Sequence, residues 1–284
     1  GVLSHLIRCA EYVKDAHKPR ILEMTDAISL NYERVRKAKD ALGFKAIVYR
    51  FEADRLLKYE REVVKKFDLS VLVSQTDKEY LVGSESDKVI VCTNGVELEH
   101  LDFKDREACG PVIVYIGNMS SFQNMDACLY FAREVMPFVI KKVKHARFRV
   151  VGRISDQDAK KLLTFPNVEV TGAVENISDA VQDAKLGVCP VRLAAGVQNK
   201  VLEYMALGLP VVTSPIGLEG FGAQPEVELL VADTPQAYAD AISRICDSTQ
   251  LHHQLAKRGL EYVQENHQWS SRLAELVERI DVLL

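Results

Sequence analysis

Short apolar runs alternate with amphipathic segments through the second half of the chain, and this alternation constrains the fold more than any other feature. The runs expected to be strands are residues 112–116, 147–151, 168–171, 185–190, 210–213 and 228–231. Strands that alternate with helices predict a doubly wound parallel sheet of the α/β class. In such sheets, ligands bind beyond the carboxyl ends of the strands.

Glycines and polar residues follow several of these strands directly. Gly117-Asn118, Gly152-Arg153, Gly172 and the loop 192–200 each come after a predicted strand. Because the carboxyl ends of parallel strands meet at one edge, we expect these segments to converge on a single pocket.

The stretch RLAAGVQNKVLEYMALGLPVVTS, residues 192–214, combines a loop, a helix and a strand. Lys200 falls at the predicted helix N-terminus, and Glu203 follows one turn later. Helix N-termini offer free N–H groups and a partial positive charge, which suit phosphate. A carboxylate beside a phosphate site could accept hydrogen bonds from ribose hydroxyls. The alternative is an exposed helix on which both charges are solvated, because short motifs also match by chance.

The segment NKVLEYMALGLPVV resembles the donor-binding segment of retaining glycosyltransferases of the GT-B fold, family 4, and is most similar to bacterial sugar transferases of exopolysaccharide clusters. The resemblance implies that Glu203 binds the ribose of a nucleotide sugar. The commoner family pattern has two glutamates separated by seven residues. The first would fall on Ala195, so we expect Gly196 and Lys200 to cover part of its role.

The resemblance also implies a set of donor-binding residues and no side-chain nucleophile. At the positions of Asn118 and Asn124, relatives commonly carry cationic side chains, and those cations hold the leaving diphosphate. Lys200, Arg153 and Arg192 are therefore the candidates for that task, although Arg153 could equally pair with a surface acid. The expected donor-binding residues are Gly117, Asn118, Arg153, Gly172, Val174, Arg192, Gly196, Asn199, Lys200, Leu202 and Glu203.

The implied partners are a UDP- or GDP-type sugar donor and a glycan or lipid-linked acceptor, with retention of configuration and no metal or other cofactor. Asp156-Gln157-Asp158 matches the DxD pattern of another fold, but Ser155 and Asp158 are placed to cap a helix. Two alternatives remain open. One is a non-catalytic nucleotide-sugar-binding or interaction module, and the other is a nucleotide-sugar epimerase, which would need a histidine in the interdomain cleft.

The first half predicts a partial Rossmann-like domain in residues 1–96. We expect a helix over 1–17, a strand over 20–25, a helical region over 30–67, a strand over 69–74, a helix over 75–81 and a strand over 88–92. Asp26 either acts at the end of its strand or caps the next helix. With only about two strands before Lys88, we expect a truncated acceptor-side domain that binds donor but transfers little sugar.

The remaining domain boundaries follow from composition and from the resemblance. Residues 97–110 read as a linker after the Asn94-Gly95-Val96 turn, and 111–265 as the nucleotide-sugar-binding domain. Residues 266–284, with Trp269 near their start, resemble the closing helix that returns to the first domain in the family.

Composition excludes several classes of protein. A formal net charge of -4 argues against a nucleic-acid binder. No apolar run approaches the roughly 20 residues of a membrane span, and the first residues do not form a signal peptide. Six scattered cysteines predict reduced thiols and a cytoplasmic protein. The charged stretch 49–67 reads as a salt-bridged helix, with a peripheral membrane helix at the inner face of the cell membrane as the alternative.

Overall fold

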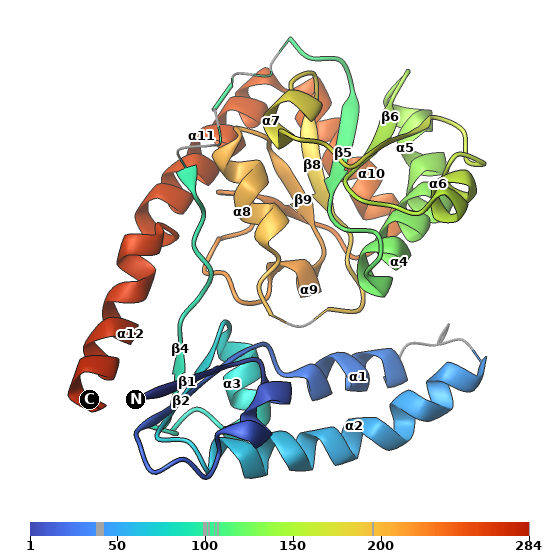
Figure 1. Ribbon diagram of the computed structural model, residues 1–284. Coiled ribbons are helices and arrows are strands. Elements are labelled where there is room, and N and C mark those ends of the chain that lie inside the picture. Colours follow the sequence, from blue (N-terminus) through green and yellow to red (C-terminus); the bar gives the residue numbers. More distant parts are fainter. Residues whose placement is uncertain are drawn as a thin grey trace.

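The chain folds into two parallel β-sheets, each covered by helices, which lie one above the other in Figure 1. The computed structural model describes residues 1–37, 43–98, 101, 103–104, 106, 108–194 and 196–283, and the side chains of all these except 37 and 43–50. The first sheet has four strands in the order β1-β2-β3-β4. The second has six in the order β10-β9-β8-β5-β6-β7.

The first sheet is parallel throughout. Its strands are β1 (Val2–His5), β2 (Arg20–Thr25), β3 (Leu69–Leu72) and β4 (Val89–Val91). The helices α1 (Ile28–Lys37) and α2 (Gly43–Val64) form a hairpin, and α3 (Gln75–Val82) leads to β4. One face of the sheet packs around buried residues such as Leu22, Leu72 and Phe67.

The N-terminal segment corrects one prediction. Residues 1–17 are not a helix: β1 pairs with β2 in parallel register, and only Ile7–Tyr12 forms a short 3₁₀-helix. Pairing with β2 overrides the helical spacing of apolar residues, and Leu6, with φ of 66°, interrupts any continuous helix. Among the described residues, three strands therefore precede Lys88, and the predicted number of about two was too low.

The second sheet matches its predicted strands closely. Its strands are β5 (Val112–Ile116), β6 (Arg147–Val151), β7 (Val168–Gly172), β8 (Leu186–Cys189), β9 (Val211–Thr213) and β10 (Leu230–Val231). All residues of β5 and β8 are buried, as central strands of a doubly covered sheet require. The strand order reverses between β5 and β8, and such a switch point is where α/β sheets bind ligands.

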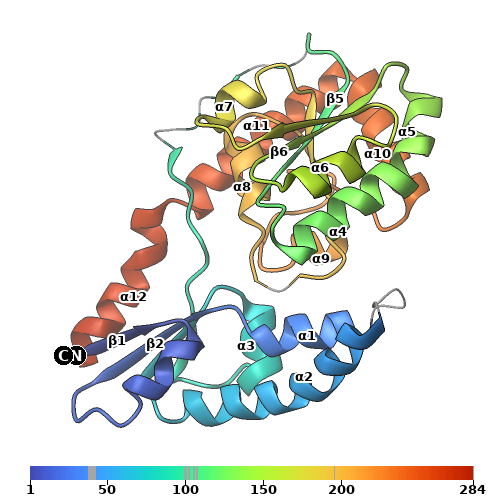
Figure 2. The same cartoon turned by 45° about the vertical axis from the view of Figure 1, so that its right-hand side comes forward.

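Helices cover both faces of this sheet (Figure 2). Two pairs of these helices pack against each other. One pair is α5 (Met136–Lys142) with α10 (Pro235–Asp247), and the other is α8 (Asn199–Ala206) with α11 (Thr249–Asn266). The second domain also contains α4 (Phe122–Tyr130), α6 (Asp156–Leu162), α7 (Ile177–Ala180) and α9 (Pro215–Leu218). A π-helical turn, Phe131–Val135, connects α4 to α5, and Pro137 lies in the first turn of α5.

The chain crosses between the domains at two neighbouring places. The N–H of Val96 donates to the carbonyl of His267 (2.8 Å), and the His267 ring Nδ1 lies 2.9 Å from the carbonyl oxygen of Asn94. A Cβ on Gly95 would lie 2.7 Å from the Trp269 ring, so only glycine fits there. The last helix, α12 (Trp269–Leu283), then runs back to the first sheet (Figure 1), where Leu276, Ile280 and Leu283 pack against its second face.

Two surface properties bear on the predictions. Among the described helices, none combines the length and the apolar character needed to cross a membrane. On α2, Arg55 pairs with Glu52 at 2.8 Å, as expected of a salt-bridged helix; the Arg50 side chain lies outside the described residues.

Candidate functional site

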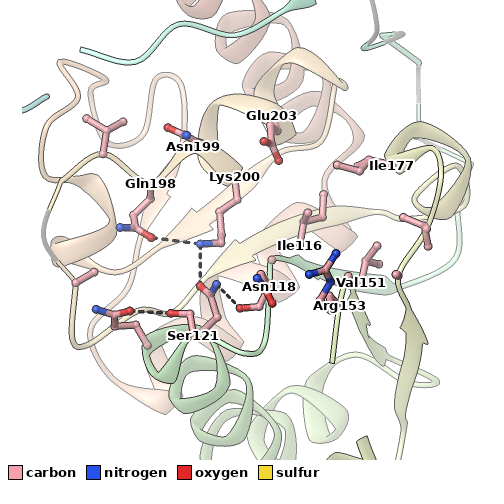
Figure 3. A pocket seen from close by; sticks show the side chains of 18 of the residues that line it. Ile116, Asn118, Ser121, Val151, Arg153, Ile177, Gln198, Asn199, Lys200 and Glu203 are labelled. Atoms are coloured by element: carbon pink, nitrogen blue, oxygen red, sulfur yellow. Dashed lines mark hydrogen bonds between the residues drawn. The ribbon is translucent and has the colours of Figure 1, made fainter. Parts of the chain in front are cut away.

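A cavity of about 720 Å³ lies at the carboxyl ends of the central strands, between the two domains. This volume is in the range of small-molecule sites. Figure 3 shows Lys200 and Glu203 facing it from α8, with Asn118 and Arg153 on neighbouring strand ends. Its walls are Asp26, Asn31, Ile116, Gly117, Asn118, Ser121, Gln123, Asn124, Val151, Gly152, Arg153, Ala173, Val174, Ile177, Ala194, Val197, Gln198, Asn199, Lys200 and Glu203.

The strand ends that form the floor are held together by main-chain hydrogen bonds. The N–H of Gly117 donates to Val151 (3.0 Å), and the N–H of Met119 donates to Arg153 (2.8 Å). Gly152 has a φ of 126°, which favours glycine. These bonds fix the loops after β5 and β6 side by side, and the cavity floor is therefore largely main chain.

Lys200 stands at the start of α8, where the first N–H groups of the helix have no intrahelical acceptor. Its Nζ lies 3.3 Å from Asn124 Oδ1 and 3.2 Å from Gln198 Oε1, and 5.2 Å from the centre of the Tyr115 ring. These partners are all neutral. The ammonium is thus held in place while its charge stays available to an anion in the cavity.

Glu203 lies one turn after Lys200 and is half-buried. Burial raises the pKa of its carboxyl group, and the nearby Lys200 ammonium partly opposes this. Within the described part of the chain, no side chain or main-chain group forms a hydrogen bond with the carboxylate oxygens of Glu203. A desolvated carboxylate in this position gains most from hydroxyl donors supplied by a ligand.

Asn118 and Asn124 form the amide corner of the cavity. The side-chain amide of Asn124 donates to the Asn118 carbonyl (2.9 Å), and its Oδ1 accepts from the Tyr115 hydroxyl (2.6 Å). The Oδ1 of Asn118 accepts the N–H of Ser120 (3.1 Å). The network orients these loops, but it contributes no charge, so the cations of the cavity are Lys200 and Arg153 as far as the described lining shows.

Four of the predicted donor-binding residues lie outside the cavity wall. Arg192 pairs with Asp126 (Nη2–Oδ1, 2.7 Å) and its guanidinium lies 4.6 Å from the centre of the Tyr130 ring. Leu202 is fully buried in the core. The carbonyl of Gly172 accepts the N–H of Gly152 (3.0 Å). Gly196 is in the loop that flanks the cavity, and Ala195 lies outside the described residues.

The first domain supplies two cavity residues. Asp26 lies at the carboxyl end of β2, and its Oδ2 accepts the amide of Asn31 from α1 (3.1 Å). Burial, and then the charge of Asp77, raise the pKa of Asp26. The strand-end rule made Asp26 a candidate from sequence. Asn31 and Gln123 carried no such signal, since each is one polar residue within a helix.

Asp158 and Glu219 each pair with a cation outside the cavity wall. Ser155 accepts the N–H of Asp158 (3.2 Å) at the start of α6, and Asp158 also pairs with Lys161, which confirms the capping interpretation of the DxD pattern. Glu219 does not line the cavity; it pairs with Arg34 of the first domain. The helix α9 that precedes Glu219 was not expected from sequence.

Comparisons with known proteins agree with this architecture. Residues 110–248 match the family described as glycosyl transferases group 1. A Klebsiella pneumoniae protein, described as an uncharacterized 44.6 kDa protein in the cps region, is 23% identical over 237 residues, which are 79% of this chain and 59% of that protein.

Solved structures share the fold at low identity. Sucrose-phosphate synthase from Thermosynechococcus elongatus superposes with a TM-score of 0.78 and 17% identity, over 99% of this chain and 73% of that one. Anabaena HepE, in complex with UDP and glucose, gives 0.75 and 13%, over 99% and 78%. TarM gives 0.73 and 15%, over 97% of this chain and 53% of that one. The chain thus has the two-domain GT-B fold and spans little more than half of the TarM and K. pneumoniae proteins.

Proposed function

We propose that this chain is the donor-binding part of a glycosyltransferase that moves a hexose from a nucleoside-diphosphate donor to an acceptor, with retention, in surface-polysaccharide synthesis. The observation that carries the proposal is the pair Lys200 and Glu203, which face one cavity from a single turn of α8. A cation at a helix N-terminus fits a diphosphate, and a carboxylate one turn away fits a ribose.

The cavity suggests an order for the parts of the donor. The apolar side, with Val174 and Ile177, suits a nucleobase held by main-chain groups. Glu203 would then accept the ribose hydroxyls, and the diphosphate would lie between Lys200 and the loop after β5. The sugar would extend toward Asp26 and Asn31, where the two domains meet.

The proposed chemistry depends on stabilising the leaving diphosphate. Negative charge develops on the bridging oxygen as the glycosidic bond breaks, and Lys200, Arg153 and the N–H groups at the start of α8 would stabilise it. The leaving phosphate oxygen would accept the proton of the attacking acceptor hydroxyl. That route needs no side-chain nucleophile, and we assign none.

The similar proteins support particular parts of the proposal. HepE in complex with UDP and glucose favours a UDP-type donor over a GDP-type one. The K. pneumoniae relative is described as lying in a cps region, which favours a role in polysaccharide synthesis. A glycan or lipid-linked acceptor would bind on the side of the first domain.

We place the reaction in the cytoplasm, and a lipid-linked acceptor would bring the chain to the inner face of the membrane. The surface that fits a membrane is α2, where Phe51 is 69% exposed and Arg55 and Lys58 are exposed nearby. Flotation with vesicles that contain anionic lipid tests this contact. Failure of the chain to float with them would remove the membrane from the proposal.

Thermal unfolding with nucleotides tests the donor site. UDP, GDP and UDP-glucose are added separately to the full chain, and a specific ligand raises the melting temperature by mass action. Lys200→Ala and Glu203→Ala should remove most of the shift. The control is Lys160→Ala, an exposed lysine on α6 outside the cavity.

Two results separate the competing functions. If no nucleoside diphosphate shifts the melting temperature of the wild-type chain, the donor site is wrong. Mass spectrometry of products from a donor panel then distinguishes a transferase from a non-catalytic binding module, which would bind donor and yield no glycosylated product.

A further inference from the structure

We infer that Arg34 and Asp77, two residues of the first domain outside the cavity wall, position the loop of the second domain that carries Ala194, Gly196 and Val197. The inference rests on the proposed function, because that loop forms the wall of the proposed donor site through Ala194 and Val197. Donor affinity would then depend on residues that never touch the donor.

Arg34 joins the domains at two points. It extends from α1, which lies on the side of the first domain that faces α9 in Figures 1 and 2. One guanidinium nitrogen donates to the carbonyl of Ala194, and another pairs with the carboxylate of Glu219. The Arg34 side chain is 16% exposed and that of Glu219 32%, so water screens this pair less than an open surface pair. A guanidinium can hold both oxygens at once because its donors form a fixed fork.

Asp77 holds the same loop two residues further on. Its Oδ2 accepts the N–H of Gly196 (3.2 Å) and the hydroxyl of Ser74, while its Oδ1 accepts the N–H of Ala27 (2.9 Å). Asp77 is fully buried. With three partners it cannot turn away without leaving a buried carboxylate under-bonded, so the loop is tied to a rigid anchor.

Close packing around the loop that carries Ala194, Gly196 and Val197 restricts the conformations it can adopt. Gly196 has a φ of 69°, and a Cβ there would lie 3.2 Å from the Cβ of Asp26. A Cβ on Gly220 would lie 2.9 Å from Val197 and 3.1 Å from Ser74. This loop is therefore packed between the first domain and the segment after α9.

Arg34 contacts this loop at Ala194 and Asp77 contacts it at Gly196, and the residues that follow lead into Gln198 and Lys200. Releasing the anchors frees the loop to adopt other conformations, and the donor must then select the competent one. The apparent dissociation constant then equals the intrinsic one divided by the fraction of molecules whose loop is in the competent conformation.

The test measures donor affinity and loop protection separately in the full chain. Calorimetric titration uses UDP, or GDP if only GDP binds the wild-type chain. Arg34→Ala should raise the dissociation constant about tenfold, the size expected for losing hydrogen bonds from a charged group. Arg34→Lys should recover part of the affinity. The control is Arg36→Ala on the same helix, whose partners are Glu33 and Asp54.

A charge exchange and a ligand-free measurement complete the test. Arg34→Glu should bind donor more weakly still, and Arg34→Glu with Glu219→Arg should regain part of the affinity. Without ligand, Arg34→Ala should speed amide hydrogen exchange at Gly196, whereas Arg36→Ala should not.

The outcomes discriminate between the two proposals. Wild-type affinity in Arg34→Ala, or unchanged exchange at Gly196, would overturn the positioning role while leaving the donor site intact. A lower melting temperature with unchanged affinity would also overturn it, because a purely structural role predicts that result. Absence of nucleotide binding by the wild-type chain would reject both proposals.

Discussion

The carbonyl oxygen of Gly117 lies 2.0 Å from the point where a Cβ on Gly152 would be placed. The ends of β5 and β6 are thus in main-chain contact at the floor of the cavity, and no side chain fits between them. The φ of Gly152, 126°, adds a second reason why only glycine is suited to this position.

Gly152→Ala should therefore destabilise the fold and disrupt nucleotide binding. We expect a loss of more than about 2 kcal/mol in the free energy of unfolding, because the clash is with main chain that cannot turn aside. Denaturant unfolding measures the loss. Gly83→Ala is the matched control, with a φ of 81° but no atom within 4 Å of the added Cβ. Equal losses in the two variants would show that strained φ, and not the clash, decides.

Tyr204 connects α8 to two central strands. Its buried hydroxyl accepts the N–H of Ile116 (2.7 Å) and donates to the carbonyl of Val188 (3.3 Å). Tyr204→Phe should lower the free energy of unfolding by about 1–3 kcal/mol, since it leaves buried polar groups without a partner. Tyr12→Phe, at a site that is 87% exposed, should stay within about 0.5 kcal/mol. An unchanged free energy of unfolding in Tyr204→Phe would contradict the stabilising role given to the Tyr204 hydroxyl.

Glu60 gives the first domain a pH-dependent stability. Its fully buried carboxyl accepts hydrogen bonds from Ser29, and burial raises its pKa to about 7. An acid with a raised pKa is protonated more readily in the folded than in the unfolded chain. Its ionisation therefore lowers the free energy of unfolding as pH rises from about 4.5 to 7.

Glu60→Gln should remove this dependence. Its free energy of unfolding, measured relative to wild type, should rise by on the order of 2–3 kcal/mol as the pH is raised from 5 to 8. Urea unfolding at several pH values measures the difference. Glu62→Gln, exposed on the same helix, should show no such trend. A Glu60→Gln difference that stays constant with pH would count against a buried, protonated carboxyl.

His267 produces the opposite dependence at the interdomain crossing. Burial lowers its pKa, so the folded chain keeps the ring neutral, with Nδ1–H donating to Asn94 and Nε2 accepting from the Tyr262 hydroxyl. The unfolded chain binds the proton more readily, and stability is lost as pH falls below about 6.5. His267→Gln should reduce this acid sensitivity, as measured by unfolding between pH 7 and 5. His17→Gln, at an exposed site, should leave it unchanged.

The second domain was predictable because its strands are buried on both faces. A fully buried strand must be a continuous apolar run, and the runs at 112–116 and 147–151 coincide with β5 and β6. The edge strand β1 was missed because its four residues include exposed positions, and the spacing of its apolar residues also fits a helix. Its identity depends on pairing with β2, which lies 18 residues away in register.

The cavity was predictable where it is made of strand ends and a helix start, as at Gly117, Lys200 and Glu203. It was not predictable where distant surfaces meet. The pairing of Arg192 with Asp126, across 66 residues of sequence, leaves Arg192 outside the cavity wall, and no local pattern specifies that choice. Asn31 reaches the cavity only because α1 faces the second domain.

The neighbouring crossings at Val96 and His267 make a single pivot for the two domains, since a hydrogen bond joins them. A rotation of a few degrees about that pivot would displace the crossing itself very little. The displacement would increase along α1 with distance from the pivot. A small rotation at the crossing would therefore change the width of the cavity opening by a much larger amount.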